Sequence, residues 1–357
     1  MRISRKIFAL IIGSTLGLCA QLSARAQDEN KPKPFTDAKQ QRAAIDPNKF
    51  AIVIAGVGGE EIYTKKFTAE ANHLYSALTN RLGFDEKHVF LLTEIVAGDP
   101  ENGLREAEAS AHRATAEEVR KAFASIKTAA KPDSLVLVVL IGHGSFDNQL
   151  AKFNLVGPDL SAKDYAQLIG TLPTRRVVFV NCSSSSGEFI KPLSGENRVI
   201  ITATRSGNEQ NATVFAEYFI AALTTDEADA DKNGRVSVLE AFDYATKMVA
   251  DFYKKQNRLA TEHALIDDNG DGAGHETATA GDGGLAKIIY LDSKTVEQAG
   301  NDAELGRLMK ERQRLEEAVE KLKARKSEMK AEDYERELEE LLVELAKVNQ
   351  AIKARQK

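Results

Sequence analysis

LVLVVLIGHGSFD (residues 135–147) and VVFVNCSSSSG (residues 177–187) are the two stretches that decide the fold. Each opens with an apolar run that is rich in β-branched residues and too short for a helix, a pattern typical of a buried strand in a parallel sheet. The first run ends just before His143 and the second just before Cys182. Because ligands bind along the carboxyl ends of parallel strands, the sequence predicts an imidazole and a thiol at one edge of a sheet.

The chain between residues 50 and 292 repeats this alternation of strand and helix patterns. Further predicted strands are FAIVIA (50–55), VFLL (89–92), VIITA (199–203) and, at one edge, LAKIIYL (285–291). The segments between them carry apolar residues at helical spacing, and Ser161 with Asp164 marks one helix start as a capping box. Alternating strands and helices predict a three-layer α/β/α sandwich with a mostly parallel sheet.

The first 26 residues have the pattern of an export signal. Arg2, Arg5 and Lys6 precede the apolar run IFALIIGSTLGLCA, and Ala24-Arg25-Ala26 offers small residues where a signal peptidase reads the chain. The run is shorter than the ~20 residues that span a bilayer, so a cleaved signal is favoured over an uncleaved anchor. We therefore expect a periplasmic or secreted mature chain without a stable membrane span. Residues 27–49, rich in Lys, Asp, Gln and Pro, are predicted to be a flexible linker.

Removing residues 1–26 takes away four basic residues, no acidic ones, and one of the two cysteines. The formal net charge moves from −5 to −9, which argues against nucleic acid as a partner. Cys182 then has no intramolecular partner, and is either a buried small hydrophobic residue, an intermolecular bridge or a working thiol. Its place at a strand end, followed by four serines, favours the working thiol.

His143 and Cys182 together suggest nucleophilic catalysis. A thiol attacks as the thiolate, so a cysteine hydrolase needs a nearby imidazole, which also protonates the leaving amine. The two residues are 39 positions apart, the length of one strand–helix–strand crossover. The backbone N–H groups of Gly144 and Cys182 are the predicted donors of an oxyanion hole.

These motifs resemble the caspase-like cysteine peptidases, a group that includes legumains, gingipains and metacaspases. Those proteins place His-Gly after one strand and a Cys with a Ser/Gly turn after the next. AIVIAGVGG (51–59) and VIITATRSGNEQ (199–210) look most like the legumain side. The resemblance implies a caspase-like fold and hydrolysis of a peptide or protein substrate, with His143 as acid/base and Cys182 as nucleophile.

The chain departs from the family pattern at two points. Gly187 follows Cys182 two positions later than in the family turn, after SSSS. Legumains have an asparagine in the turn after the first strand, where this chain has Gly58 or Gly59. The alternative function is therefore a non-catalytic caspase-like adaptor.

DADKNGRVSVLE (229–240) matches the calcium loop of an EF-hand. Its oxygen ligands at positions 1, 3, 5, 7, 9 and 12 are Asp229, Asp231, Asn233, the Arg235 carbonyl, Ser237 and Glu240. DDNGDG (267–272) begins in the same way with Asp267, Asn269 and Asp271, but Ala278 stands where the bidentate Glu belongs. The sequence predicts structural calcium in the first loop and a partial second site.

Residues 293–357 change in character and carry heptad spacing among dense Glu, Lys and Arg. The apolar positions are Leu308, Leu315, Leu322 and Met329, then Tyr334, Leu338, Leu341, Leu345, Val348 and Ile352. A polar interruption near residues 327–333 divides them. This predicts a C-terminal α-helical coiled coil, either a two-helix hairpin or one long helix, for self-association or for a protein partner.

Overall fold

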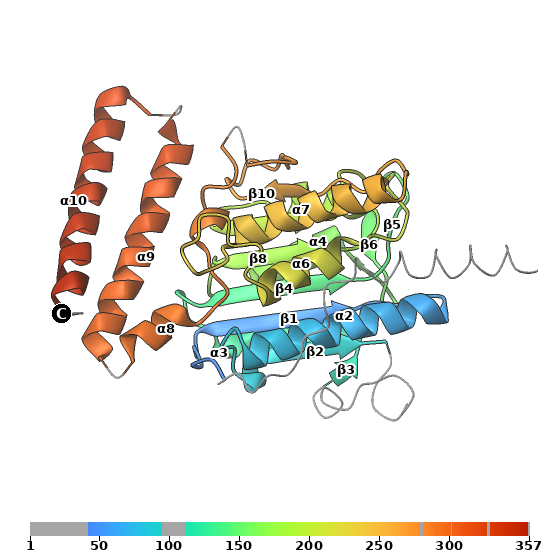
Figure 1. Ribbon diagram of the computed structural model, residues 1–357. Helices are drawn as coiled ribbons and strands as arrows, with labels where there is room; N and C mark the ends of the chain where they lie inside the picture. Colours follow the sequence, from blue (N-terminus) through green and yellow to red (C-terminus); the bar gives the residue numbers. More distant parts are fainter. Residues whose placement is uncertain (1–41, 95–110, 279–280, 301, 327–328, 356–357) are drawn as a thin grey trace, which may run out of the picture. The chain divides into compact units, whose positions relative to one another are not determined.

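The computed structural model describes residues 42–94, 111–278, 281–300, 302–326 and 329–355 (Figure 1). The predicted signal segment (1–26) and the predicted linker up to residue 41 lie outside the described residues. Among the helices of the described part, none is both long and apolar enough to cross a membrane.

A seven-stranded sheet forms the centre of the described chain, with strand order β10-β9-β8-β4-β1-β2-β3. All neighbouring strands run parallel except β9 and β10, which are antiparallel. The strands are β1 (Lys49–Ala55), β2 (Val89–Thr93), β3 (Ala111–Arg113), β4 (Leu135–Ile141), β8 (Val177–Asn181), β9 (Arg198–Thr202) and β10 (Leu265–Asp267). The predicted α/β fold with a mostly parallel sheet is confirmed.

Helices cover both faces of this sheet (Figure 1). One face packs against α2 (Glu61–Asn80), α6 (Phe215–Thr224) and α7 (Val238–Lys255), and the other against α3 (Ala116–Ala129), α4 (Ala162–Gly170) and α5 (Ile190–Leu193). Side chains of β1 alternate between the two cores, with Val53 in the first and Ile52 in the second. The predicted capping box of Ser161 and Asp164 begins α4.

Several short elements differ from the sequence prediction. The predicted edge strand at 285–291 is wrong: residues there form the 3₁₀ turn η4 (Ala286–Ile288) and one isolated bridge from Tyr290 to Ser237. Short edge strands, β3 and β10, take the two outer positions instead.

A separate antiparallel sheet contains β5 (Gly144–Phe146), β6 (Ala151–Phe153) and β7 (Leu160–Ser161). Strands of two or three residues are too short to leave a readable period in the sequence. The remaining short elements are η1 (Glu86–His88) and η3 (Ser186–Phe189).

The C-terminal part contains α8 (Lys294–Ala299), α9 (Ala303–Ala324) and α10 (Ala331–Arg355). The last two lie side by side in opposite directions (Figure 1), with Arg355 Nε 3.0 Å from Asp302 Oδ2. Leu305, Met309 and Ile352 form their shared apolar cluster. Of the two predicted arrangements, the structure has the two-helix hairpin. The supercoiling of a coiled coil stays a prediction.

Gly187→Ala tests how tightly the loops after β8 and β9 are packed. A Cβ at residue 187 would lie 2.6 Å from the Arg205 carbonyl oxygen, against backbone that cannot rotate away. We expect the free energy of unfolding to fall by about 1–3 kcal/mol, the usual cost of overpacking, in a denaturant titration. Gly170→Ala, with no atom within 4 Å of the added Cβ, is the matched control and should not destabilise. Equal losses in both variants would contradict this packing.

Candidate functional site at the carboxyl edge of the sheet

The loops after β4 and β8 touch, as the sequence predicted. The two strands pair in register from Val136↔Val177 to Leu140↔Asn181, so both loops leave the same edge of the sheet. Gly144 N–H donates to Ser184 Oγ at 3.1 Å. A Cβ at residue 144 would lie only 2.8 Å from Ser183 Oγ, so this close approach requires glycine.

His143 is half-buried and held by aromatic rings and by the backbone. Tyr63 and Phe67 of α2 each lie with their ring centroid 5.0 Å from the imidazole, edge to face. Burial lowers the pKa of His143, and a hydrogen bond to the backbone of Gly58 opposes that effect. The turn after β1 thus contacts the ring through its backbone.

Cys182 lies in the core, with only 2% of its surface exposed. Its side chain belongs to the same apolar cluster as Val178 and Val180, so it continues the strand alternation inward. Burial raises the pKa of the thiol well above its usual value, and the charges of Glu70 and Glu262 raise it further. Because the thiolate is the nucleophile, these surroundings oppose the predicted working thiol and match a buried small hydrophobic residue.

The predicted oxyanion donors are already bonded within the protein. Cys182 N–H donates to the Leu140 carbonyl at 2.8 Å as part of the β4–β8 ladder, and Gly144 N–H donates to the Ser184 hydroxyl. A bonded amide hydrogen is not available to a developing oxyanion. The structure therefore disagrees with this part of the prediction.

The four serines after Cys182 form a buried turn that is hydrogen-bonded to neighbouring segments, although the Ser185 hydroxyl has no partner in the described part of the chain. Each is at most 2% exposed. Ser183 Oγ donates to Asn181 Oδ1 at 2.7 Å, Ser184 Oγ donates to the Gly144 carbonyl at 3.2 Å, and Ser185 N–H donates to the Glu209 carbonyl at 2.8 Å. The Ser186 and Thr204 hydroxyls share a hydrogen bond at 3.1 Å. This arrangement makes the turn rigid and keeps it closed to solvent.

Two carboxyl groups whose charges act on the thiol were not singled out in the sequence: Glu262 is buried, and Glu70 has 12% of its side chain exposed. Burial raises the pKa of Glu70 and of Glu262 to about 7 in each case. Lys66 Nζ lies 3.7 Å from Glu70 Oε1, and Glu262 accepts from the Val214 N–H at the start of α6 at 2.9 Å. Helical spacing in α2 places Glu70 on the apolar face, a signal available in the sequence; Glu262 lies in an irregular segment without such a signal.

The loop at 229–240 brings its predicted acidic ligands together. Among the described residues, one group of at least three such side chains lies close enough to hold an ion: Asp229, Asp231 and Glu240, each with an oxygen within 4.8 Å of the others. Carboxylate oxygens at such separations are ligands of the kind that Ca²⁺ takes. Gly234, with φ +80°, stands at the tight-turn position of the loop.

The remaining predicted ligands of this loop have other partners as well. Ser237 caps α7 in a capping box with Glu240, whose Oε1 also accepts from Ala230 N–H at 3.0 Å. The Arg235 side chain pairs with Asp292 at 2.7 Å, and the ligand expected from this position is its backbone carbonyl. Asn233 N–H donates to Asp229 Oδ1 at 3.0 Å.

The second acidic loop repeats the backbone pattern of the first. The position-6 N–H donates to the position-1 carboxylate in both, from Gly234 to Asp229 at 2.8 Å and from Gly272 to Asp267 at 3.1 Å. Asn269 and Asp271 contact each other, with Nδ2 and Oδ2 3.2 Å apart. Ala278 supplies no oxygen at position 12, so this loop has an incomplete ligand set, as predicted from its sequence.

The buried acids make stability depend on pH. Their folded pKa of about 7 exceeds the unfolded value of about 4.5, so the native state binds more protons between these limits. We expect the free energy of unfolding to fall as pH rises from about 4.5 to 7, by up to about 1.4 kcal/mol per pH unit for each group. Glu70→Gln should flatten this slope in urea titrations, whereas the exposed Glu61→Gln should leave it unchanged. A slope of the opposite sign would refute the assignment.

No protein-family model matches the chain, and no curated protein matches it. Among solved structures, protein GSU0716 from Geobacter sulfurreducens is similar at 12% sequence identity and a TM-score of 0.39. The match covers 61% of this chain and 92% of that one. A likeness this weak carries no argument about function.

Proposed function

We propose that the chain is a caspase-like protein that acts as a non-catalytic binding scaffold. The observation that carries this proposal is the surroundings of Cys182, a thiol that is 2% exposed, with a pKa raised by burial and by two carboxyl groups. A cysteine peptidase needs the opposite: an accessible thiol whose pKa is lowered by a positive neighbour. The sealed serine turn and the bonded oxyanion donors agree with this function.

The second candidate is a peptidase that hydrolyses peptide bonds at the same edge. Two observations favour it: β4 and β8 are neighbours, and His143 is oriented by Gly58 beside the loop after β8. In this case the nucleophile is the Cys182 thiol or the Ser183 hydroxyl, and either would be exposed only after a rearrangement. Export to the periplasm or to the medium remains part of both proposals, since it depends on the N-terminal pattern alone.

The scaffold proposal gives the C-terminal hairpin the role of contacting a partner or a second copy. Leu342 and Val343 of α10 are 47% and 45% exposed, large apolar side chains on a helix that α9 covers on one side. Such side chains favour association.

Calcium would support the scaffold by neutralising Asp229, Asp231 and Glu240. The ion would supply positive charge among three carboxylates and hold the start of α7, where Glu240 lies in the first turn. Its proposed role is structural, with affinity in the weak range of extracellular modules.

Thiol labelling separates the two candidates. The native chain should react with Ellman's reagent no faster than the Cys182→Ala variant, and should gain one reactive thiol over that variant only in guanidinium. The comparison with Cys182→Ala removes any signal from Cys19. Rapid labelling of Cys182 in the native chain would contradict the buried thiol.

Peptide cleavage is measured on the same proteins with fluorogenic peptides varied at the residue before the scissile bond. Under the scaffold proposal, Cys182→Ala, Ser183→Ala and His143→Ala all leave any cleavage rate unchanged. Loss of cleavage in His143→Ala and in one of the other two, with unaltered circular dichroism, would establish the peptidase and identify its nucleophile.

If calcium binds this loop, the free energy of unfolding of the chain should be higher in calcium than in chelator. At a tenfold excess over Kd the gain is about 1.4 kcal/mol, measured as a shift of the urea midpoint. Asp229→Asn should abolish most of this gain, and Asp267→Asn in the incomplete second loop should keep it. Equal midpoints in calcium and in chelator would refute the site.

A further inference from the structure

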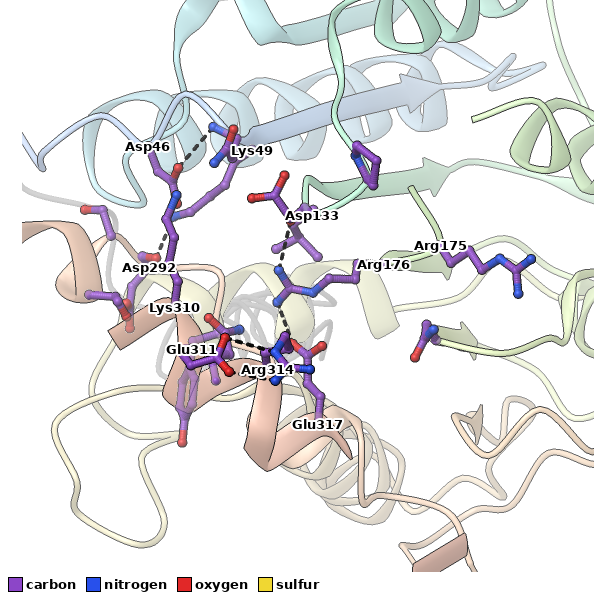
Figure 2. A pocket seen from close by; sticks show the side chains of 18 of the residues that line it. Asp46, Lys49, Asp133, Arg175, Arg176, Asp292, Lys310, Glu311, Arg314 and Glu317 are labelled. Atoms are coloured by element: carbon purple, nitrogen blue, oxygen red, sulfur yellow. Dashed lines mark hydrogen bonds and ion pairs between the residues drawn. The ribbon is translucent and has the colours of Figure 1, made fainter. Parts of the chain in front are cut away.

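A cavity of about 670 Å³ lies at the opposite, amino-terminal edge of the sheet (Figure 2). The segments that lead into β1, β4 and β8 form one wall, through Lys49, Asp133 and Arg176. Helix α9 forms the facing wall. The volume is that of a small-molecule site, and the edge is distinct from the one that carries His143.

The lining of this cavity is strongly charged, with an excess of positive charge. Eight lysines and arginines face five aspartates and glutamates, although the whole chain has a net charge of −5. Most of the arginines are neutralised within the protein; for example, Arg176 Nη2 lies 2.8 Å from Glu317 Oε1, and Arg314 Nη2 lies 2.6 Å from Glu311 Oε1. The charge that remains is concentrated on lysines.

Lys310 and Lys321 are the two lysines of α9 in the lining, and neither has an ion pair or hydrogen bond within the described part of the chain. Together with Arg314 and Glu317 they are spaced at intervals of four, three and four residues, so all four lie on one face of the helix. Figure 2 shows Lys310 and Arg314 on α9, opposite Lys49 and Arg176 of the sheet edge.

Arg176 has one donor left over. Its Nη1 donates to the Asp133 carbonyl at 3.2 Å and its Nη2 pairs with Glu317, while its buried Nε has no acceptor. Glu317 Oε1, its neighbour, also lacks a hydrogen bond in the described part of the chain, so Arg176 and Glu317 form an ion pair with unused donor and acceptor capacity. The planar guanidinium suits phosphate oxygens in particular.

We propose that this cavity binds a small soluble anion that carries more than one negative charge, of the phosphate-ester class. Such a ligand would offset the unpaired positive charge that Lys310 and Lys321 bring to the cavity, and it would link α9 to the edge of the sheet. The site is independent of the function at the carboxyl edge, since it shares no residue with His143, Cys182 or the serine turn.

Isothermal titration of the full chain with pyrophosphate tests the site. We expect saturable binding of one pyrophosphate per chain, with an affinity at least tenfold lower in the double variant Lys310→Gln/Lys321→Gln. The double variant Lys347→Gln/Lys353→Gln, a matched loss of two charges at exposed positions of α10 outside the cavity, should bind as the unmodified chain does. Circular dichroism checks that each variant is folded.

Three results would overturn the proposal. The first is no saturable binding at millimolar pyrophosphate, and the second is an equal loss of affinity in Lys347→Gln/Lys353→Gln, which would indicate general charge attraction. The third is binding to phosphatidylglycerol vesicles or to single-stranded DNA without binding to pyrophosphate, which would indicate a membrane or a nucleic acid as the partner. Loss of affinity confined to the double variant supports the cavity.

Discussion

The hydrogen-bonded pairing of β4 with β8 is the constraint on which the carboxyl edge depends. Both strands are buried and both are hydrogen-bonded to a further neighbour, β4 to β1 and β8 to β9, so a slip of one residue would disrupt ladders on both sides. The register is therefore fixed, and with it the approach of Gly144 to Ser183 and Ser184. The rigid serine turn follows from this contact.

The same pairing decides the state of Cys182. Side chains alternate along a strand, and residue 182 has the same parity as Val178 and Val180, which face α2 and α6. The thiol therefore enters the core, where desolvation and the charges of Glu70 and Glu262 favour its neutral form. His143, three positions after Leu140 in a turn, leaves the sheet and keeps contact with solvent. The carboxyl edge of the sheet thus presents the oriented imidazole of His143, while Cys182 stays a buried, neutral thiol.

The acidic loop and the amino-edge cavity share an anchor. Arg235 in the loop pairs with Asp292 and stacks over the ring of Tyr290 at 3.9 Å, and all three residues line the cavity. The acidic loop therefore contacts the cavity wall directly. Both are distant in the sequence from the strands that form the opposite wall. The hairpin completes this region through Glu317 and Arg176.

The amino-acid sequence by itself determined the alternating strands and helices, the two strand ends at His143 and Cys182, the capping box of Ser161 and the acidic loop. These features depend on local periodicity and on short-range spacing, which a sequence displays directly. The sequence also predicted either a hairpin of two helices or one long helix at the C-terminus. The structure shows that the hairpin forms. The short strands β3, β5, β6, β7 and β10 left no period to read.

Only the tertiary structure decided which face of the sheet Cys182 enters, where the charges of Glu70 and Glu262 act on it. It also brought Arg176 and Lys310 to one cavity. A strand buried on both faces is apolar at every position, so its sequence does not show which side chains point to which core. Burial and long-range contacts set the pKa of a thiol, and both arise only when distant segments pack together.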